Sequence, residues 1–594
     1  LIVALNLSAK NLNPAIFSPS WPGDLALELA INTSTAANGS PLIQASLNTT
    51  GQLRHHPFAL KTVAEFMVDA NKNYLLTIDK LLLNSGGSSI AGDAIFEANK
   101  TLSANWLVSS NNLEELIPNT KGKLNTKGSV GINMPLSKTP TVNDLLHAIK
   151  TKLTLSASDI AAFNIKIGTL TTLADINWQD NKNGDENTLT FNSEKLSYDS
   201  FNIEYISAKL NGDPDKHQLK IDLQKTKGDI DLQLLGQLVD NANAPEWQFI
   251  VESAKVTLFE LAPWYLQNSM GGILSKSSQM INNHCWVSDA KSNDKKAKIC
   301  LDANNKSGLS DINFKLEELS VGYFSVFFPE EISWTDSFIN GQGTINIITD
   351  LPSAFQQVDA DIHLQTTAGK LNWQTLSIQD NSSHSNDNNS QQSIALGAGS
   401  FSITSDNQAI KALLKLPVEA QTGFDSSLVI RNNKDSLIEG DIEGKLSLAL
   451  DNIEPLNFFI PDSKGLKGKL DSQWRIGGSL AKPWFNGQLA LSEGQLLLLS
   501  PGILLEDITL NLKSDEQAGI EYQASFNSGG GTLRAAGKMT LADGKQAPEL
   551  QLSLQGERIK VFDTREALIF ASPDITIATV GDLININGSI TIPE

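Results

Sequence analysis

Apolar and polar side chains alternate at every second residue through much of this chain. Successive side chains of a β-strand point to opposite faces of a sheet, so each run predicts a strand with one apolar and one polar face. The intervening residues are mostly Asp, Lys, Asn, Gln, Ser and Thr. The apolar positions are Tyr74, Leu76, Ile78, Leu219, Ile221, Leu223, Ile230, Leu232, Leu234, Trp247, Phe249, Val251, Ile312, Phe314, Leu316, Ile345, Ile347, Ile362, Leu364, Leu428, Ile430, Leu446, Leu448, Leu450, Ile508, Leu510, Leu512, Leu550, Leu552, Leu554, Ile590 and Ile592.

Short turn signals separate these runs. Asn, Asp and Gly tolerate the positive φ angles of tight hairpin turns. Closely spaced strands joined by such turns predict an all-β fold, a long and mostly antiparallel sheet with few helices. The expected turns are Asn-Gly-Asp at 211–213, Asn-Gly-Gln at 340–342, Gly-Gly at 86–87 and 477–478, and Ala-Asp-Gly at 542–544.

Two segments predict helices instead. Residues 140–153 are expected to form a turn or two of amphipathic helix, and residues 260–281 are the strongest helix candidate. The expected domains are therefore a sheet segment over 1–260, a helix and cysteine-linked excursion over 261–305, and a second sheet segment over 306–594.

A short apolar segment that ends at proline recurs three times, each time before a glycine that opens an alternating strand. The three copies begin at 113, 324 and 456, with irregular spacing. Each predicts a short helix that crosses or plugs a sheet edge, ahead of a similar block of strands. The polar stretch 380–393 has nothing to bury and predicts a loop.

The charge balance disfavours two classes of partner. Formal net charge is −20 and the isoelectric point is about 4.8. An acidic chain repels phosphate backbones and anionic membrane surfaces, so nucleic-acid binding and broad electrostatic adhesion to membranes are not expected.

The chain has two cysteines, Cys285 and Cys300, separated by a polar segment. They form a disulfide, which implies an oxidising compartment, or they are two unrelated buried thiols. No C-x-x-C motif is present, and His284 adds at most one further ligand, so a zinc or redox site is not expected.

Catalytic motifs are missing from the sequence. The seven histidines are scattered, and none stands at a recognisable spacing from a nucleophile or carboxylate. The glycines at 85–88 and 528–532 precede strands and open no helix, so a phosphate-binding loop is unsupported. We expect neither enzymatic activity nor a metal or other cofactor.

The first residues lack the features of a targeting segment. LIVALNLS has no basic region or cleavage site, and no apolar run approaches the ~20 residues that a membrane-spanning helix needs. The chain is expected to be a piece of a longer polypeptide, with any membrane anchor outside it.

The aliphatic face of the sheet is the remaining candidate site. A two-faced sheet hides this face by packing on a second sheet, or curves into a trough that is lined but not filled. A trough suits a hydrocarbon chain, since each buried CH₂ contributes about 0.8 kcal/mol. The rarity of exposed apolar patches favours the filled interior, and the 7% aromatic share favours the trough. The expected lining residues are Leu446, Leu448, Leu450, Leu489, Leu491, Leu497, Leu499, Ile508, Leu510, Leu512, Leu550, Leu552 and Leu554.

Residues 475–512 follow a more specific pattern. A glycine-led strand precedes a P-x-x-x-G crossing, a G-x-L-x-L-x-x-G strand and G-I-x-L-x-D-I-x-L-x-L. This block resembles the TamB family of bacterial envelope proteins, within the wider AsmA-like group. Segments 11–30, 283–303, 528–541, 571–577 and 587–594 continue the likeness. The matching residues of the block are Pro483, Gly487, Leu489, Leu491, Gly494, Gly502, Ile503, Leu505, Asp507, Ile508, Leu510 and Leu512.

The resemblance implies a long curved sheet with an elongated U-shaped apolar groove, in the periplasm of a Gram-negative bacterium. It implies a bridge-like conduit in which phospholipid acyl chains slide between the inner and outer membranes. The alternative is an assembly factor for outer-membrane β-barrel proteins that works with the barrel protein TamA. An inner-membrane anchor and the contact with TamA are implied outside this segment, no catalytic residues are implied, and an oxidising periplasm favours the disulfide. A weaker alternative is an adhesin-like β-solenoid with a closed core.

Overall fold

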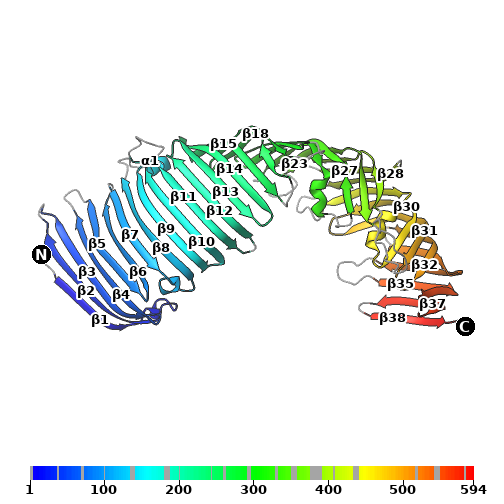
Figure 1. Ribbon diagram of the computed structural model, residues 1–594, viewed down its shortest axis with the longest axis horizontal. Helices are drawn as coiled ribbons and strands as arrows, with labels where there is room; N and C mark the ends of the chain where they lie inside the picture. Colours follow the sequence, from blue (N-terminus) through cyan, green and yellow to red (C-terminus); the bar gives the residue numbers. More distant parts are fainter. Residues whose placement is uncertain are drawn as a thin grey trace, which may run out of the picture. The chain divides into compact units, whose positions relative to one another are not determined.

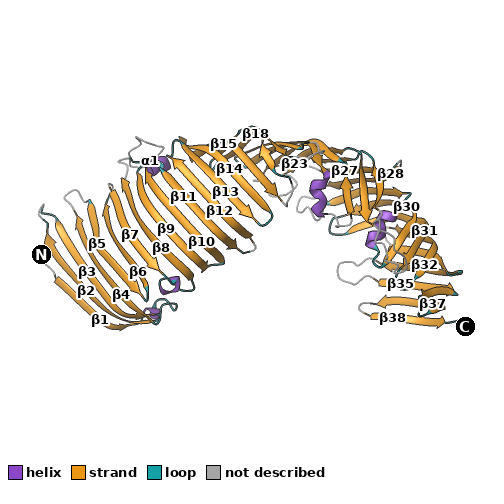
Figure 2. Ribbon diagram, viewed as in Figure 1, coloured by secondary structure: helices purple, strands orange, loops and turns teal. Residues whose placement is uncertain are grey.

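The structure is a computed structural model in which 38 strands and a few short helices are described. Figure 2 shows how strongly strands predominate, so the predicted all-β antiparallel fold is confirmed. The chain falls into two units, residues 1–292 and 293–594. The described residues are 4–36, 39–68, 73–98, 101–133, 141–179, 187–199, 201–241, 244–258, 262–289, 296–327, 332–348, 358–374, 391–405, 409–419, 421–431, 440–515, 519–540, 549–580 and 583–593.

Unit 1 is an antiparallel meander, in which each strand from β1 to β15 pairs with the next along the chain (Figure 1). After β15 the chain makes two short strands, β16 and β17, which both pair with β15 and β18. The strands of unit 1 are β1 (Ala4–Leu12), β2 (Gly23–Thr35), β3 (Pro41–Leu53), β4 (His56–Val68), β5 (Tyr74–Ser85), β6 (Ser88–Glu97), β7 (Thr101–Ser110), β8 (Lys121–Asn133), β9 (Ile149–Ala162), β10 (Ile165–Asn177), β11 (Thr188–Tyr198), β12 (Phe201–Gly212), β13 (His217–Lys225), β14 (Gly228–Asn241), β15 (Ala244–Leu258), β16 (Trp264–Leu266), β17 (Met270–Leu274) and β18 (Ser278–Ser288).

Unit 2 repeats the antiparallel pairing with two side branches. A small sheet of β21, β24 and β25 joins at β27, and β36 pairs with the first half of β37. The strands of unit 2 are β19 (Lys298–Lys306), β20 (Leu309–Ser320), β21 (Ile332–Thr335), β22 (Phe338–Ile348), β23 (Val358–Thr366), β24 (Gly369–Gln374), β25 (Gln391–Leu396), β26 (Ser400–Ser405), β27 (Ala409–Val418), β28 (Gln421–Arg431), β29 (Asp441–Leu450), β30 (Ser463–Gly478), β31 (Pro483–Leu498), β32 (Ile503–Asp515), β33 (Gly519–Ser528), β34 (Gly531–Thr540), β35 (Glu549–Glu557), β36 (Ile559–Asp563), β37 (Leu568–Val580) and β38 (Leu583–Thr591).

Short helices stand at strand ends. The three recurring apolar segments correspond to the 3-10 helices η2 (Leu113–Glu115), η4 (Val321–Phe327) and η5 (Glu454–Phe459), which confirms that each recurrence starts with a short helix. A further turn, η1 (Pro14–Ile16), follows β1, and the one α-helix among the described residues is α1 (Val142–His147).

The helix predicted over 260–281 is wrong. These residues contribute β16, β17 and the start of β18, where Met270 pairs with Val251 of β15. The adjacent glycines Gly271 and Gly272 are poor helix formers, and pairing with β15 satisfies their backbone instead. The tertiary partner therefore overrides the local apolar pattern.

Two smaller predictions are corrected in part. The helix predicted over 140–153 exists as α1, with a capping box between Thr141 and Asp144, but from Ile149 the chain is strand β9. The turn predicted at 340–342 lies inside β22, where Gly341 pairs with Leu364. The turn expected at 542–544 and most of the loop expected at 380–393 lie outside the described residues.

Strand register decides where the core lies. In unit 1 one uncharged residue from each strand of β1 to β15 stands directly opposite the next, forming a continuous row. We call the side of the sheet that carries this row the apolar face of unit 1. The row is Leu7, Leu29, Leu47, Thr62, Leu81, Gly92, Trp106, Gly128, Leu153, Ala174, Leu189, Leu210, Leu219, Leu234 and Val251.

An equivalent row runs through unit 2 from β27 to β38 and defines its apolar face. Like the first row, it contains no charged residue. It consists of Leu416, Phe424, Leu448, Ser472, Leu489, Leu512, Tyr522, Gly537, Leu552, Ile577 and Ile586.

Candidate functional site

The predicted lining residues fall largely on the apolar face of unit 2. Leu489 and Leu491 of β31 stand opposite Leu512 and Leu510 of β32, and the leucines of β29 and β35 join the same side through the intervening strands. All of these side chains are half-buried. The residues placed on this face are Leu446, Leu448, Leu450, Leu489, Leu491, Ile508, Leu510, Leu512, Leu550, Leu552 and Leu554.

Two of the predicted lining residues lie elsewhere: Leu497 because β31 contains a bulge, and Leu499 because it lies beyond the end of that strand. The register shifts between Leu491 and Gly494, where Glu493 adopts a positive φ of 54°. One extra residue reverses which positions face the core, so Leu496 lies on the apolar face and Leu497 on the opposite one. Leu499 follows the end of β31, in the turn before β32.

Several strands of unit 1 were predicted from the sequence, but none of their residues was named as a lining residue. The signal was present, because the alternation in β13, β14 and β15 has the same period as that in unit 2. Only the register between strands shows that Leu219, Leu234 and Val251 belong to one row with Leu29 and Leu47.

Much of this apolar surface is not covered by the chain. The accessible area is 35996 Å², against about 20,000 Å² expected for a compact protein of this mass. Across β1 to β5 the exposed fractions are 48% for Leu7, 37% for Phe66 and 37% for Leu76. Contiguous apolar surface of this kind marks a binding face in soluble proteins.

Helix η5 covers part of the apolar face of unit 2. Ile453, Leu466 and Leu496 form a buried cluster, against which η5 places Leu456 and the chain after it places Ile460. Leu491 and Ile508 contribute to the same cluster, so these two predicted lining residues pack partly against the protein itself. The apolar face of unit 2 is therefore open in some places and closed in others.

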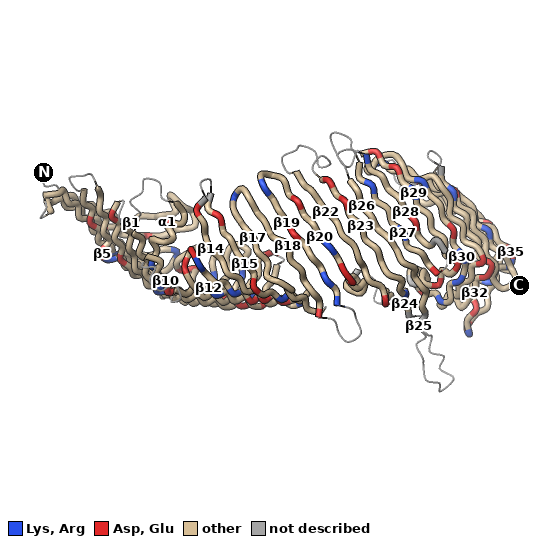
Figure 3. Tube along the Cα trace, turned by 90° about the horizontal axis from the view of Figure 1, so that it is seen from above, with Lys and Arg blue, Asp and Glu red and all other residues tan. Residues whose placement is uncertain are grey.

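Charged residues gather on the opposite, polar faces. Exposed ion pairs join neighbouring strands there, for example Lys152 to Asp175 and Arg431 to Glu443, with N–O distances of 2.9 and 2.8 Å. Acidic and basic residues are interspersed along the strands in both units (Figure 3). Such surface pairs contribute little to stability, but they keep this side of each sheet hydrated.

Two open concavities lie mainly on the polar faces. One of about 850 Å³ in unit 1 is bordered by Asp93, Asn105 and Lys127, and one of about 990 Å³ in unit 2 by Lys445 and Arg475. Charged and amide groups dominate the lining of the second concavity and suit water and polar ligands. The first has a mixed lining, in which several leucines stand among the charged residues.

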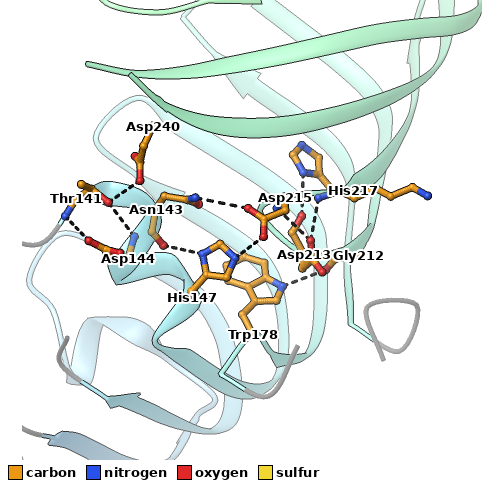
Figure 4. A network of polar contacts seen from close by, with 11 residues as sticks. Thr141, Asn143, Asp144, His147, Trp178, Gly212, Asp213, Asp215, His217 and Asp240 are labelled. Carbon is orange, nitrogen blue, oxygen red and sulfur yellow. Dashed lines mark hydrogen bonds and ion pairs between the residues drawn. The ribbon is translucent and has the colours of Figure 1, made fainter. Parts of the chain in front are cut away.

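A polar network fastens α1 to the ends of β12 to β14 (Figure 4). Thr141 Oγ1 donates to Asp240 at 2.7 Å, and His147 Nε2 lies 2.9 Å from Asp215 Oδ2. Partial burial lowers the pKa of His147, but hydrogen bonds with the Asn143 carbonyl and the Asp215 carboxylate outweigh burial and raise it. The network holds a helix at the strand ends, away from the centre of the apolar row.

The remaining chemistry of the described residues is sparse. Within them, no three His, Cys, Asp or Glu side chains gather where they could hold a metal ion. Both cysteines, Cys285 in β18 and Cys300 in β19, are disulfide-bonded. No helix in the described part of the chain is long and apolar enough to span a membrane.

These features define a class of protein: antiparallel sheets that keep one face charged and hydrated and the other aliphatic and partly open. The description "TamB, N-terminal domain" matches residues 3–491, and the chain belongs to this family. It is also similar to the translocation and assembly module subunit TamB of Haemophilus influenzae, with 21% identity over 98% of this chain. The chain spans 41% of that relative's length.

Proposed function

We propose that this chain is a segment of a periplasmic conduit that moves phospholipids between the inner and outer membranes. The apolar faces hold the acyl chains while the headgroups stay in water. The protein carries out no covalent chemistry and needs no cofactor. An inner-membrane anchor and a contact with the outer-membrane barrel protein TamA belong to parts of the polypeptide outside these residues.

The observation that carries this proposal is the unbroken uncharged row across β1 to β15. With strands about 4.8 Å apart, the row extends about 65 Å along the sheet, far longer than one acyl chain. Each buried CH₂ contributes about 0.8 kcal/mol, so the lining attracts hydrocarbon at every position. A site for one fixed apolar ligand would need only a few strands.

The mostly aliphatic character of the row favours movement over storage. Neighbouring positions such as Leu153, Ala174 and Leu189 differ little in chemistry. An acyl chain that slides by one strand exchanges one aliphatic contact for another, so no position forms a deep energy minimum. Movement along the face is then passive, and direction must be imposed by what the ends of the whole protein contact.

A second function, assembly of outer-membrane β-barrel proteins together with TamA, is favoured by the name of the Haemophilus influenzae relative, a subunit of a translocation and assembly module. In that case the partly open apolar face would shelter the lipid-facing side of an unfolded barrel strand. Photocrosslinking separates the two functions, because acyl-chain probes label the face in the first and unassembled barrel proteins label it in the second.

A charge inserted into the apolar face tests the conduit directly. In the full-length protein, Leu510→Asp places a carboxylate between Leu491 and Ala524 on the face. We expect phospholipid transfer to fall at least tenfold, because a passing acyl chain must contact a solvated charge. Asn511→Asp is the matched control, since Asn511 lies next along β32 and faces the other way.

The conduit is contradicted if Leu510→Asp and equivalent changes at Leu448 and Leu552 transfer phospholipid at the wild-type rate while the protein stays folded. The control variant should transfer normally in either case.

A further inference from the structure

Large aromatic residues on the apolar faces lie opposite glycines. Side chains on a strand normally stand roughly perpendicular to the sheet. At four places an aromatic ring instead occupies the space that a Cβ on the facing glycine would need, so the ring lies flat on the neighbouring strand. These pairs, which we call the flat aromatic pairs, are Trp106 with Gly128, Phe249 with Gly272, Phe314 with Gly343, and Tyr522 with Gly537.

Trp106 and Gly128 form the clearest of these pairs. All three atoms nearest to a Cβ built at Gly128 belong to the indole of Trp106. At Gly343 a Cβ would lie 2.6 Å from the Phe314 ring, again with side-chain atoms as its nearest neighbours. Any larger residue at these two glycines has to push a ring aside, and the free direction is away from the sheet.

Hydrogen bonds hold two of the rings down. Trp106 Nε1 donates to Thr126 Oγ1 at 3.3 Å, and the Tyr522 hydroxyl donates to the Gln551 carbonyl at 2.7 Å. The first bond ties the indole to the adjacent strand β8, and the second reaches across β34 to β35. The ring then presents its face to the apolar side, and its polar atom is withdrawn from any apolar guest.

We propose that the glycines of the flat aromatic pairs keep the apolar face clear for an acyl chain. This inference rests on the proposed function. An upright indole would project across the path of a sliding chain, whereas a flat one adds area to the lining. Glycine weakens a strand interior, and a ring lying over it compensates by covering the backbone. That stabilising role alone would suit either face of the sheet.

The polar face supplies the control for that role. Trp484 lies over Gly477 in the same way, with ring atoms as the nearest neighbours of a Cβ built at the glycine. Gly477 is two residues from the exposed Arg475 of the same strand, so the pair faces the polar side of β30 and β31. Gly477→Ala therefore lifts a tryptophan of the same kind where no acyl chain is proposed to pass.

The experiment compares four full-length proteins: wild type, Gly128→Ala, Gly477→Ala, and Gly128→Ala combined with Trp106→Leu. Transfer of fluorescent phospholipid between donor and acceptor vesicles is measured, together with thermal unfolding. We expect Gly128→Ala to transfer at least fivefold more slowly and the double variant to recover to within about twofold of wild type. Gly477→Ala should shift the melting temperature as Gly128→Ala does, but leave transfer unchanged.

Three outcomes overturn the inference. Gly128→Ala could transfer as fast as wild type, the double variant could stay as slow as Gly128→Ala, or Gly477→Ala could slow transfer equally. If Gly128→Ala does not fold, Gly343→Ala with and without Phe314→Leu provides the same comparison. A wild-type protein that transfers no phospholipid overturns the proposed function itself, and that result is separate from the behaviour of the variants.

Discussion

Helices η2 and η5 lie in similar sequences, LEELIP and LNFFIP. The contacts that hold them to the sheet differ. Besides the buried Leu113, polar contacts hold η2: Glu115 accepts hydrogen bonds from Ser88 Oγ at 2.6 Å and from Gly87 N at 2.9 Å. Apolar contacts hold η5, which packs Leu456 against the buried cluster around Leu496. A short helix with this sequence pattern can therefore stand at a strand end, as η2 does, or cover part of the apolar face, as η5 does.

The consequence is a difference in how far the two faces are exposed. Across β1 to β5 of unit 1, large side chains such as Leu7 and Leu76 remain more than a third exposed. Around β30 to β32 of unit 2, Leu466 and Leu496 are buried, with exposed fractions of only 5% and 7%. Stability should therefore depend on apolar packing in the second region far more than in the first.

The largest expected effect comes from emptying the cluster beneath η5. Leu496→Ala should destabilise unit 2 by about 2–5 kcal/mol, because a buried leucine loses its contacts and leaves a cavity. Leu76→Ala, on the open face of unit 1, should cost about 1 kcal/mol or less. Denaturant unfolding of both variants measures the difference, and equal losses would show that the open face is packed after all.

The next effect concerns η2. Glu115→Ala removes the shortest of the hydrogen bonds of Ser88, which is 1% exposed, together with the acceptor for Gly87 N, and should destabilise unit 1 by about 1–3 kcal/mol. Glu115→Gln keeps an acceptor oxygen and should retain most of the stability. If both variants unfold like wild type, polar contacts do not hold η2, and the contrast with η5 disappears.

The smallest effect is a pH dependence at α1. The pKa of His147 is raised in the folded protein, so the contribution of its contact with Asp215 is complete below the unfolded pKa and is lost as pH rises through the folded pKa. Protection factors of the α1 amides, which remove the pH dependence of intrinsic exchange, should be higher near pH 6 than near pH 8, on the order of severalfold. Asp215→Asn should remove most of this dependence; an unchanged profile in that variant would assign it to another group.

The strands could be predicted from the sequence because alternation is a local signal. Leu219, Leu448 and Leu552 were each expected on an apolar face, and their register places them there. Bulges and crossing helices could not be predicted in this way. The positive φ at Glu493, which turns Leu497 to the opposite face, and the cluster that covers Ile508 depend on contacts between strands.

Glycine was the most ambiguous signal. Gly271 and Gly272 lie in a segment whose apolar residues suggested a helix, and Gly341 suggested a turn, yet all three are strand residues. A glycine inside an alternating run is better interpreted together with the aromatic residue that faces it across the sheet. That partner is known only once the register is known, as for Trp106 and Gly128.

Site-specific photocrosslinking along the sheet tests the central claim most directly. A photoreactive amino acid replaces, one at a time, Leu219 and Leu489 on the apolar faces and their neighbours Lys220 and Gln488 on the polar faces, in the full-length protein in cells. We predict phospholipid adducts at Leu219 and Leu489 and none at Lys220 and Gln488. Equal labelling of both faces, or adducts on neither, would contradict an apolar face that carries acyl chains.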